Sequence, residues 1–237
     1  MLLRRITQHV QNQNWFAVFI DFLIVVVGVF IGIQVANLNA VQQADSKEAV
    51  KLELLKTEFT AVISDLRKAK VRNDKTVDAT LEVLRIIRDG NEPADKVAFL
   101  ETISHSGSFN AGPLEPAALT ELLASGSLTS LTSQTLRTAL IKYHEQAYGH
   151  KETSNIVYDR VSAPHDGFHA VAHVNPNFKT DGKLLDKYDW SRISEMREQQ
   201  QVMFYGKHSL SLSMEELVKR GDKVLAEITV AQTSNAK

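Results

Sequence analysis

The chain has no cysteine among its 237 residues and only five prolines. The absence of cysteine excludes disulfide bonds, thiolate metal sites and a cysteine nucleophile, and it is compatible with either side of a membrane. No charge of one sign dominates either, because 27 Lys and Arg stand against 28 Asp and Glu. With a formal net charge of -1 and no long basic run, the sequence predicts no nucleic-acid partner.

The sequence also lacks the motifs that carry common enzyme chemistry. It has no Gly-x-Ser-x-Gly elbow, no paired acidic motif and no glycine-rich nucleotide loop. Its Ser125-Gly126-Ser127 element has neither a strand before it nor a Gly-Lys-Ser/Thr ending, so it is interpreted as a helix C-cap. We therefore predict a protein without enzyme activity and without a cofactor.

What the sequence does contain is a long apolar run near its start. Within residues 16–35 only Asp21 and Gln34 interrupt it. A helix of about 20 apolar residues spans the hydrocarbon core of a bilayer, which is about 30 Å thick. We therefore predict a transmembrane helix over residues 15–38, preceded by a cytoplasmic or interfacial segment over residues 1–14.

A cleaved signal peptide is the alternative interpretation of this run. The apolar part of a signal peptide is about 7 to 15 residues long and ends in small residues, whereas this run is longer and holds a carboxylate. The flanking charges, Arg4 and Arg5 before the run and Lys47 and Lys51 after it, favour a cytoplasmic N-terminus only slightly. We expect a bacterial inner-membrane protein whose residues 39–237 form a periplasmic helical domain.

One face of the predicted transmembrane helix is suited to contact a second helix. Gly28 and Gly32 form a Gly-x-x-x-Gly pair, which lets two helix backbones approach closely in lipid. Steps of three and four residues place this pair on a face that we call the glycine stripe, made of Asp21, Val25, Gly28, Gly32, Val35 and Asn39. The leading hypothesis is a membrane-anchored scaffold that forms homo-oligomers through this stripe and presents its helical domain to another membrane or periplasmic protein.

Asp21 supports a second hypothesis from a different class. An ionised carboxylate at the centre of a membrane helix costs about 2.5 to 3.5 kcal/mol on insertion scales, and such groups commonly serve ion pathways. The layout of a short leading segment, an early Asp in one anchor and a large outer domain is similar to that of proton-driven stator subunits. The stator residues around the aspartate are missing here. A tolerated, neutral Asp21 near the interface is the third interpretation.

Two segments resemble a widespread bacterial family of uncharacterised, N-terminally anchored single-pass membrane proteins. Residues 28–39, GVFIGIQVANLN, are similar to its Gly-x-x-x-Gly-x-Gln anchor ending, although Leu38 stands where that family usually has tryptophan. Residues 119–145 are similar to its Glu-Leu-x-x-Ser-Gly-x-Leu element and the Tyr-containing helix after it, carried by Glu121, Leu122, Ser125, Gly126, Leu128, Leu136, Arg137 and Tyr143. The resemblance implies the layout of an anchor with an outer domain and no known activity.

The rest of the chain predicts an all-α bundle. A heptad seam over residues 44–89 indicates one long helix or two in tandem, with Asn73 and Asp74 as a bend or a polar layer that sets the register. The seam also fits a coiled-coil stalk, but it is short for one, so a bundle helix is favoured. Caps and apolar spacing predict further helices over 93–104, 117–124, 133–161, 190–205 and 214–230, with a surface loop over 174–189.

Three histidines at a spacing of four are the one candidate metal site. His165, His169 and His173 would stack along one face if their segment were helical, and neutral imidazole is a common zinc ligand. One helix does not readily wrap three such ligands around a single ion, and Gly167 disfavours helix. Ordinary surface histidines are the favoured interpretation, and a zinc-binding module is the alternative.

Overall fold

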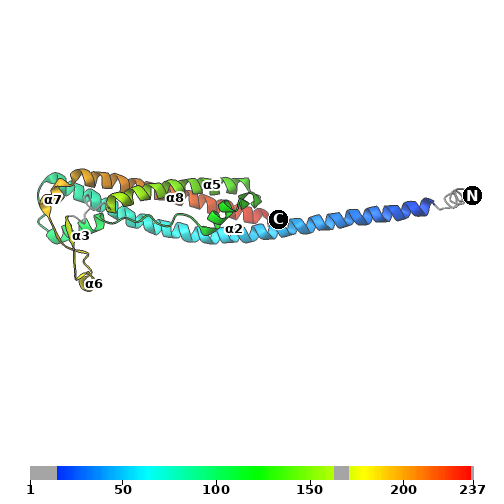
Figure 1. Ribbon diagram of the computed structural model, residues 1–237, viewed down its shortest axis with the longest axis horizontal. Coiled ribbons are helices and arrows are strands. Elements are labelled where there is room, and N and C mark those ends of the chain that lie inside the picture. The colour runs from blue at the N-terminus through cyan, green and yellow to red at the C-terminus, as the bar shows by residue number, and fades with distance from the viewer. Residues whose placement is uncertain (1–14, 163–170, 236–237) are drawn as a thin grey trace, which may run out of the picture. The chain divides into compact units, whose positions relative to one another are not determined.

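The computed structural model describes residues 15–162 and 171–235, and these form a mostly helical protein (Figure 1). The predicted all-α class is confirmed. The elements in chain order are α2 (Trp15–Asp89), α3 (Lys96–Ser106), α4 (Ala117–Ala124), η1 (Ser127–Ser130), α5 (Gln134–Ser162), β1 (Ala172–Val174), α6 (Phe178–Asp181), β2 (Leu185–Tyr188), α7 (Trp190–Glu195) and α8 (Arg197–Asn235).

Helix α2 is continuous over 75 residues, so the predicted anchor and the predicted heptad helix are one element. Neither glycine nor proline occurs between residues 33 and 89, and therefore nothing interrupts the helical hydrogen-bond ladder there. The helix runs through Asn73 and Asp74 without interruption. Gly90, at φ +77°, ends α2 and donates its N–H to the carbonyl oxygens of Ile86 and Ile87.

The chain divides into two compact units, residues 1–50 and residues 51–237. In the described part of the first unit, every side chain from Val18 to Lys47 is exposed, including the apolar run from Val18 to Val35. This is the one helix of the described chain that is long and apolar enough to cross a membrane.

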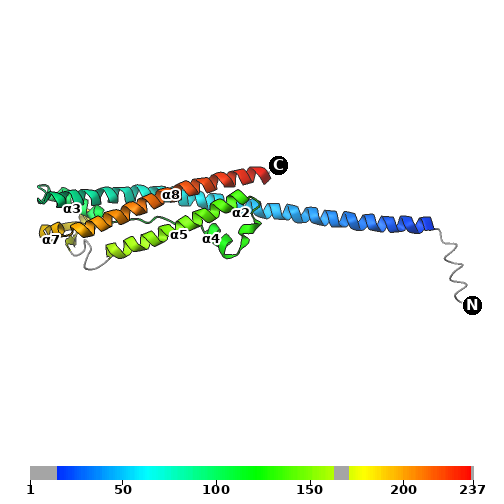
Figure 2. The ribbon, with the colours of Figure 1, turned by 90° about the horizontal axis from the view of Figure 1, so that it is seen from above.

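In the second unit, α2 from Lys51 onward lies beside the two other long helices, α5 and α8 (Figures 1 and 2). Helices α5 and α8 are antiparallel. Near the start of α5, the Arg220 guanidinium donates to the Lys142 carbonyl at 3.2 Å. One turn further along α5, the Gln146 amide donates to the Ser213 hydroxyl at 3.2 Å, one to two turns earlier in α8.

The main hydrophobic core lies among α2, α4, α5 and α8. Its centre includes Phe59 of α2 and Tyr143 of α5, whose rings meet edge to face with centroids 4.9 Å apart. The heptad periodicity of the sequence predicts Val62 and Leu84 at two seam positions, and both predictions are wrong by one residue, because Ile63 and Val83 are the buried residues. An α-helix has 3.6 residues per turn, so a seam read at 3.5 drifts off the buried face of a straight helix.

A smaller core closes the other end of the bundle, where α2 ends. It contains Val83, Ile87, Phe99, Ile103, Val171, Ala172, Ile193 and Met196. The Phe99 ring meets Tyr188 and Trp190 edge to face, at centroid distances of 5.1 and 5.9 Å. These contacts hold α3, β2 and α7 together.

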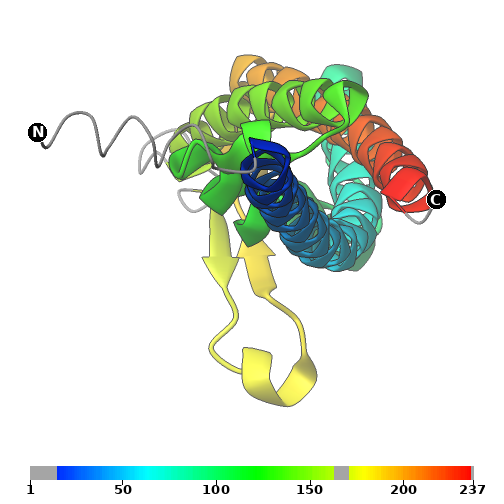
Figure 3. The same ribbon diagram turned by 90° about the vertical axis from the view of Figure 1, so that its right-hand side faces the viewer.

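The predicted surface loop over residues 174–189 is wrong, because part of it forms an antiparallel hairpin (Figure 3). Strand β1 pairs with β2 in the register Ala172 to Tyr188 and His173 to Lys187. The buried Asn175 side chain closes the intervening loop by donating to the Asp181 carboxylate and to the Lys183 carbonyl. Short strands of this kind leave no clear alternation in the sequence, which is why the pattern missed them.

Helix boundaries agree with the sequence where a side-chain cap is local. Helix α4 spans its predicted residues, and Gly126 follows it at φ +66°. Ser133 caps α5 through its hydroxyl, which accepts from the Leu136 N–H at 3.2 Å. Helix α3 begins at Lys96 under the Asp95 cap, and not at Pro93.

The last two predicted helices are divided at the wrong place. Helix α7 ends at Glu195, and α8 then runs unbroken from Arg197 to Asn235. The helix start predicted at residue 214, with Ser213 as its N-cap, is therefore wrong, and the Ser213 hydroxyl accepts a hydrogen bond from α5. A serine inside a helix that finds a tertiary partner leaves the helix intact.

Candidate functional site

The glycine stripe lies on the exposed first part of α2. All six of its residues are exposed. A Cβ added at Gly28 or Gly32 would meet no heavy atom of the described chain within 4 Å. The stripe is thus a continuous open surface with two side-chain gaps one turn apart, which is the geometry that admits a second helix backbone.

Of the three histidines, only His173 lies in the described chain. It belongs to strand β1, opposite Lys187, and its side chain is exposed. The helical stacking that motivated the zinc prediction therefore does not hold at His173. His165 and His169 lie outside the described residues, and within residues 15–162 and 171–235 no group of three His, Cys, Asp or Glu could hold a metal ion. Zinc binding stays a prediction.

The structure reveals a feature that the sequence did not predict as a whole, a buried polar layer between the two cores. On α2 three of the four buried residues between Ala69 and Val83 are polar, namely Asn73, Thr76 and Thr80, and the fourth is Val77. Helices α5 and α8 contribute to the same layer. The polar layer consists of Asn73, Thr76, Thr80, Ser106, His150, Ser154 and Lys207, all buried.

Lys207 is the charge-bearing member of the polar layer, and its side chain is fully buried. Its Nζ donates to the Ser106 carbonyl at the end of α3 and to the Thr80 hydroxyl at 3.3 Å. Both partners are neutral, and burial lowers the pKa of Lys207 from 10.5 to about 7. The amide of Asn73 donates to the Lys207 backbone carbonyl at 3.1 Å, which fixes α8 against α2 at this level.

His150 is the second titratable member of the polar layer. One ring nitrogen, Nε2, lies 2.8 Å from the Ala111 carbonyl, and since a carbonyl only accepts, this nitrogen carries the proton. The other ring nitrogen, Nδ1, has no partner among the described groups, and neither do Asn73 Oδ1 and Ser154 Oγ. Burial lowers the pKa of His150, although its bond to Ala111 acts in the opposite direction.

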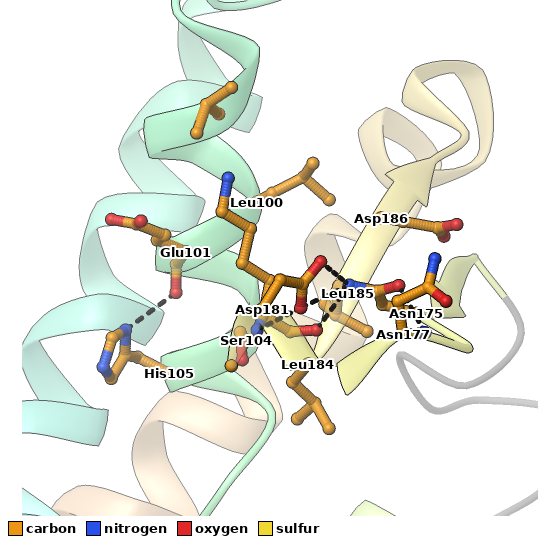
Figure 4. A pocket seen from close by; sticks show the side chains of 13 residues that line it. Leu100, Glu101, Ser104, His105, Asn175, Asn177, Asp181, Leu184, Leu185 and Asp186 are labelled. Carbon is orange, nitrogen blue, oxygen red and sulfur yellow. Dashed lines mark hydrogen bonds between the residues drawn. The ribbon is translucent and has the colours of Figure 1, made fainter. Parts of the chain in front are cut away.

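A surface pocket of about 740 Å³ lies between α3 and the β1–β2 hairpin (Figure 4). Carboxylates of Glu101, Asp181 and Asp186 line it, together with Lys183 and His105. Both Asp181 oxygens are engaged in closing the hairpin loop, and the Lys183 N–H and the Asn175 amide lower the pKa of Asp181. Asp181 therefore serves the fold of the hairpin loop.

The sequence predicted the glycine stripe and three members of the polar layer. The heptad periodicity places Thr76 and Thr80 at inward seam positions and marks Asn73 as a polar position, and all three are buried. Lys207 and His150 carried no signal, since a lysine and a histidine at helical positions are normally solvated. Comparisons with protein-family models, with curated proteins and with solved structures give no match to this chain.

Proposed function

We propose that this protein is a non-enzymatic membrane scaffold. In this proposal the first part of α2 is an anchor in the bacterial inner membrane, and the helical domain is presented in the periplasm. The anchor self-associates through the glycine stripe, and the domain binds another membrane or periplasmic protein.

The observation that carries the proposal is the exposed apolar run at the start of α2. Its side chains include Phe16, Phe19, Phe22 and Phe30, which are 59 to 71% exposed. Monomeric soluble proteins rarely expose a contiguous apolar surface of this extent, and lipid is the environment that covers it at least cost. The glycine stripe gives this surface one face suited to a helix partner.

Helix association is tested by filling the two gaps in the stripe. Gly28→Ile with Gly32→Ile adds two branched side chains to the contact face, and we expect the oligomer to dissociate in detergent. Val26→Ile with Phe30→Ile changes the opposite face and is the matched control, which should keep the assembly. Oligomer mass is measured by light scattering with detergent correction. An unchanged mass in the glycine variant would show that the stripe is not the contact surface.

Membrane anchoring is tested separately by carbonate extraction of native membranes. The full-length chain should stay with the membrane pellet. Recovery of the chain in the soluble fraction, shortened near Ala40, would instead identify the run as a cleaved signal. This outcome would refute the anchor without reference to oligomer state.

An ion pathway through Asp21 is the second candidate function. Asp21 is the only ionisable residue between residues 16 and 44, and it shares the helix face of Gly28 and Gly32. In an oligomer formed through the stripe, its carboxylate would face protein and not lipid. Asp21→Asn should abolish proton-dependent flux in reconstituted vesicles under this candidate, whereas the scaffold proposal predicts the same flux as protein-free vesicles for both chains.

A further inference from the structure

The connection between α3 and α4 is an extended segment that lies along the bundle. We call residues 106–116 the strap. Three side chains hold it by its backbone carbonyl oxygens. Lys207 of α8 donates to the Ser106 carbonyl, His150 of α5 donates to the Ala111 carbonyl at 2.8 Å, and Tyr143 of α5 donates to the Leu114 carbonyl at 2.9 Å.

The strap covers the main core between α2 and α5. Gly112, at φ +71°, lies so close to α2 that an added Cβ would be 3.0 Å from both Ala69 Cβ and Leu66 Cδ1. Phe109 packs against the main core and meets the Tyr158 ring edge to face at 6.3 Å. Lifting the strap would therefore expose apolar surface that is now buried.

Two of the three side chains that hold the strap are buried bases. Lys207 and His150 both belong to the polar layer, and no ion pair joins either of them to a carboxylate in the described chain. A proton added to His150 would go to Nδ1, the ring nitrogen without a partner. A charge placed on either group is therefore buried without compensation, which strongly disfavours the closed arrangement.

The other charged groups around the strap have partners of their own. On α2, the Asp74 carboxylate accepts from Lys70 at 2.8 Å and from the Ser211 hydroxyl, and His208 of α8 lies near it. On α5, His144 contacts Glu115 of the strap at a partly exposed position. Further titratable groups near the strap are exposed and include Asp65, Lys68, Arg72, Tyr158 and, on α3, His105.

The pair of His144 and Glu115 opposes lifting of the strap in acid. Protonation of His144 would turn this contact into an ion pair. Partly exposed pairs of this kind contribute about 0 to 1 kcal/mol. A buried charge without an ionic partner costs more free energy than this pair contributes. Protonation of the polar layer therefore outweighs the pair and favours the lifted strap in acid.

From this arrangement we propose that the strap is a proton-controlled cover, closed on the bundle while Lys207 and His150 are neutral and lifted from α5 when both become charged. The bases sit at two of the three points where the strap is held, so adding protons to them and releasing the strap there are coupled. Lifting of the strap is driven by hydration of the two charged side chains, because they have no contact with water in the closed polar layer.

The proposal is tested by measuring the position of the strap at two pH values. Because the chain has no cysteine, Ser108→Cys on the strap and Thr138→Cys on α5 provide two exposed sites for nitroxide labels. Distances are measured on the full chain in detergent micelles by double electron–electron resonance, at about pH 8.5 and about pH 5.5, on either side of histidine titration. We expect one narrow distance distribution at the higher pH and a longer, broader one at the lower pH.

Two variants separate the polar layer from the surface pair. Lys207→Met with His150→Gln removes both titrations while the Gln amide can still donate to Ala111, so the narrow distribution should persist at both pH values. Glu115→Gln removes the charge opposite His144 and should keep the full response. Loss of the response in Glu115→Gln, or its persistence in the double variant, would overturn the proposal. If circular dichroism shows the double variant to be unfolded, identical wild-type distributions at the two pH values would still refute it.

Discussion

Gly221 lies on α8 against the main core, and adding one methyl group there tests how closely α8 packs on its neighbours. A Cβ at this position would be 2.0 Å from Ile63 Cδ1, 2.6 Å from Ile63 Cγ1 and 3.4 Å from Tyr143 Cε2. Ile63 and Tyr143 are both fully buried, so the Ile63 side chain has no solvent-filled space to move into. We predict that Gly221→Ala destabilises the domain.

Two opposing effects set the size of this change. Replacing glycine by alanine inside a helix stabilises by about 0.5 to 1 kcal/mol, because the unfolded chain loses conformational freedom. Forcing an extra methyl group into a packed core costs about 1 to 3 kcal/mol. The closest contact is far below van der Waals distance, so the packing cost dominates and the net loss should be about 1 to 2 kcal/mol.

Gly149→Ala is the matched control, because Gly149 is exposed on α5 and an added Cβ there meets nothing within 4 Å. This variant should gain about 0.5 to 1 kcal/mol from the helix effect alone. Adding Ile63→Val to Gly221→Ala removes the nearer clashing atom, so the double variant should lose less stability than the sum of the two single variants.

The free energy of unfolding is measured by denaturant titration of the full chain in detergent, followed by circular dichroism. If Gly221→Ala stabilises the protein as much as Gly149→Ala does, the described packing of α8 on Ile63 is wrong. Additive losses for Gly221→Ala and Ile63→Val would contradict the specific contact.

Three further predictions concern the polar layer, a helix cap and the hairpin. Because the pKa of Lys207 falls from 10.5 to about 7 on folding, the unfolded chain binds more protons between these values, and stability should rise with pH across that window by up to about 5 kcal/mol. Denaturant titrations at several pH values give the free energy of unfolding as a function of pH, and Lys207→Met should flatten its rise. If the variant shows the same rise as the wild type, the lowered pKa does not belong to Lys207. Asp95→Ala removes the α3 cap, which accepts from Val97 and Ala98, and should lower the unfolding free energy by about 1 kcal/mol, whereas Asp95→Asn should lower it less. Asn175→Ala should speed amide hydrogen exchange in the hairpin and leave the exchange rates in α5 unchanged. Equal protection of the hairpin in the wild type and in the variant would show that the loop closes without this side chain.

The sequence by itself predicted the features that depend on local chemistry. The apolar run, the glycine stripe and the all-α class follow from composition and from periodicity along one helix. Caps that use a neighbouring side chain or glycine were also predicted, namely the C-cap at Gly126 and an N-cap at Thr132 or Ser133, of which Ser133 caps the helix. The Asp95 cap was missed because Pro93 offered a competing helix start two residues earlier.

Tertiary contacts decided the remaining features. Ser213 has the chemistry of a cap, but contact with Gln146 on α5 leaves it inside a continuous helix. Lys207 and His150 are ordinary polar residues in the sequence, and they become buried bases only because α3 and the strap close over them. This burial depends on contacts between distant parts of the chain. The hydrogen bond of His150 to Ala111 joins residues 39 positions apart, and that of Lys207 to Ser106 joins residues 101 positions apart. Local patterns determine which segments are helical, whereas the environment of each side chain is determined by which distant segments pack against it.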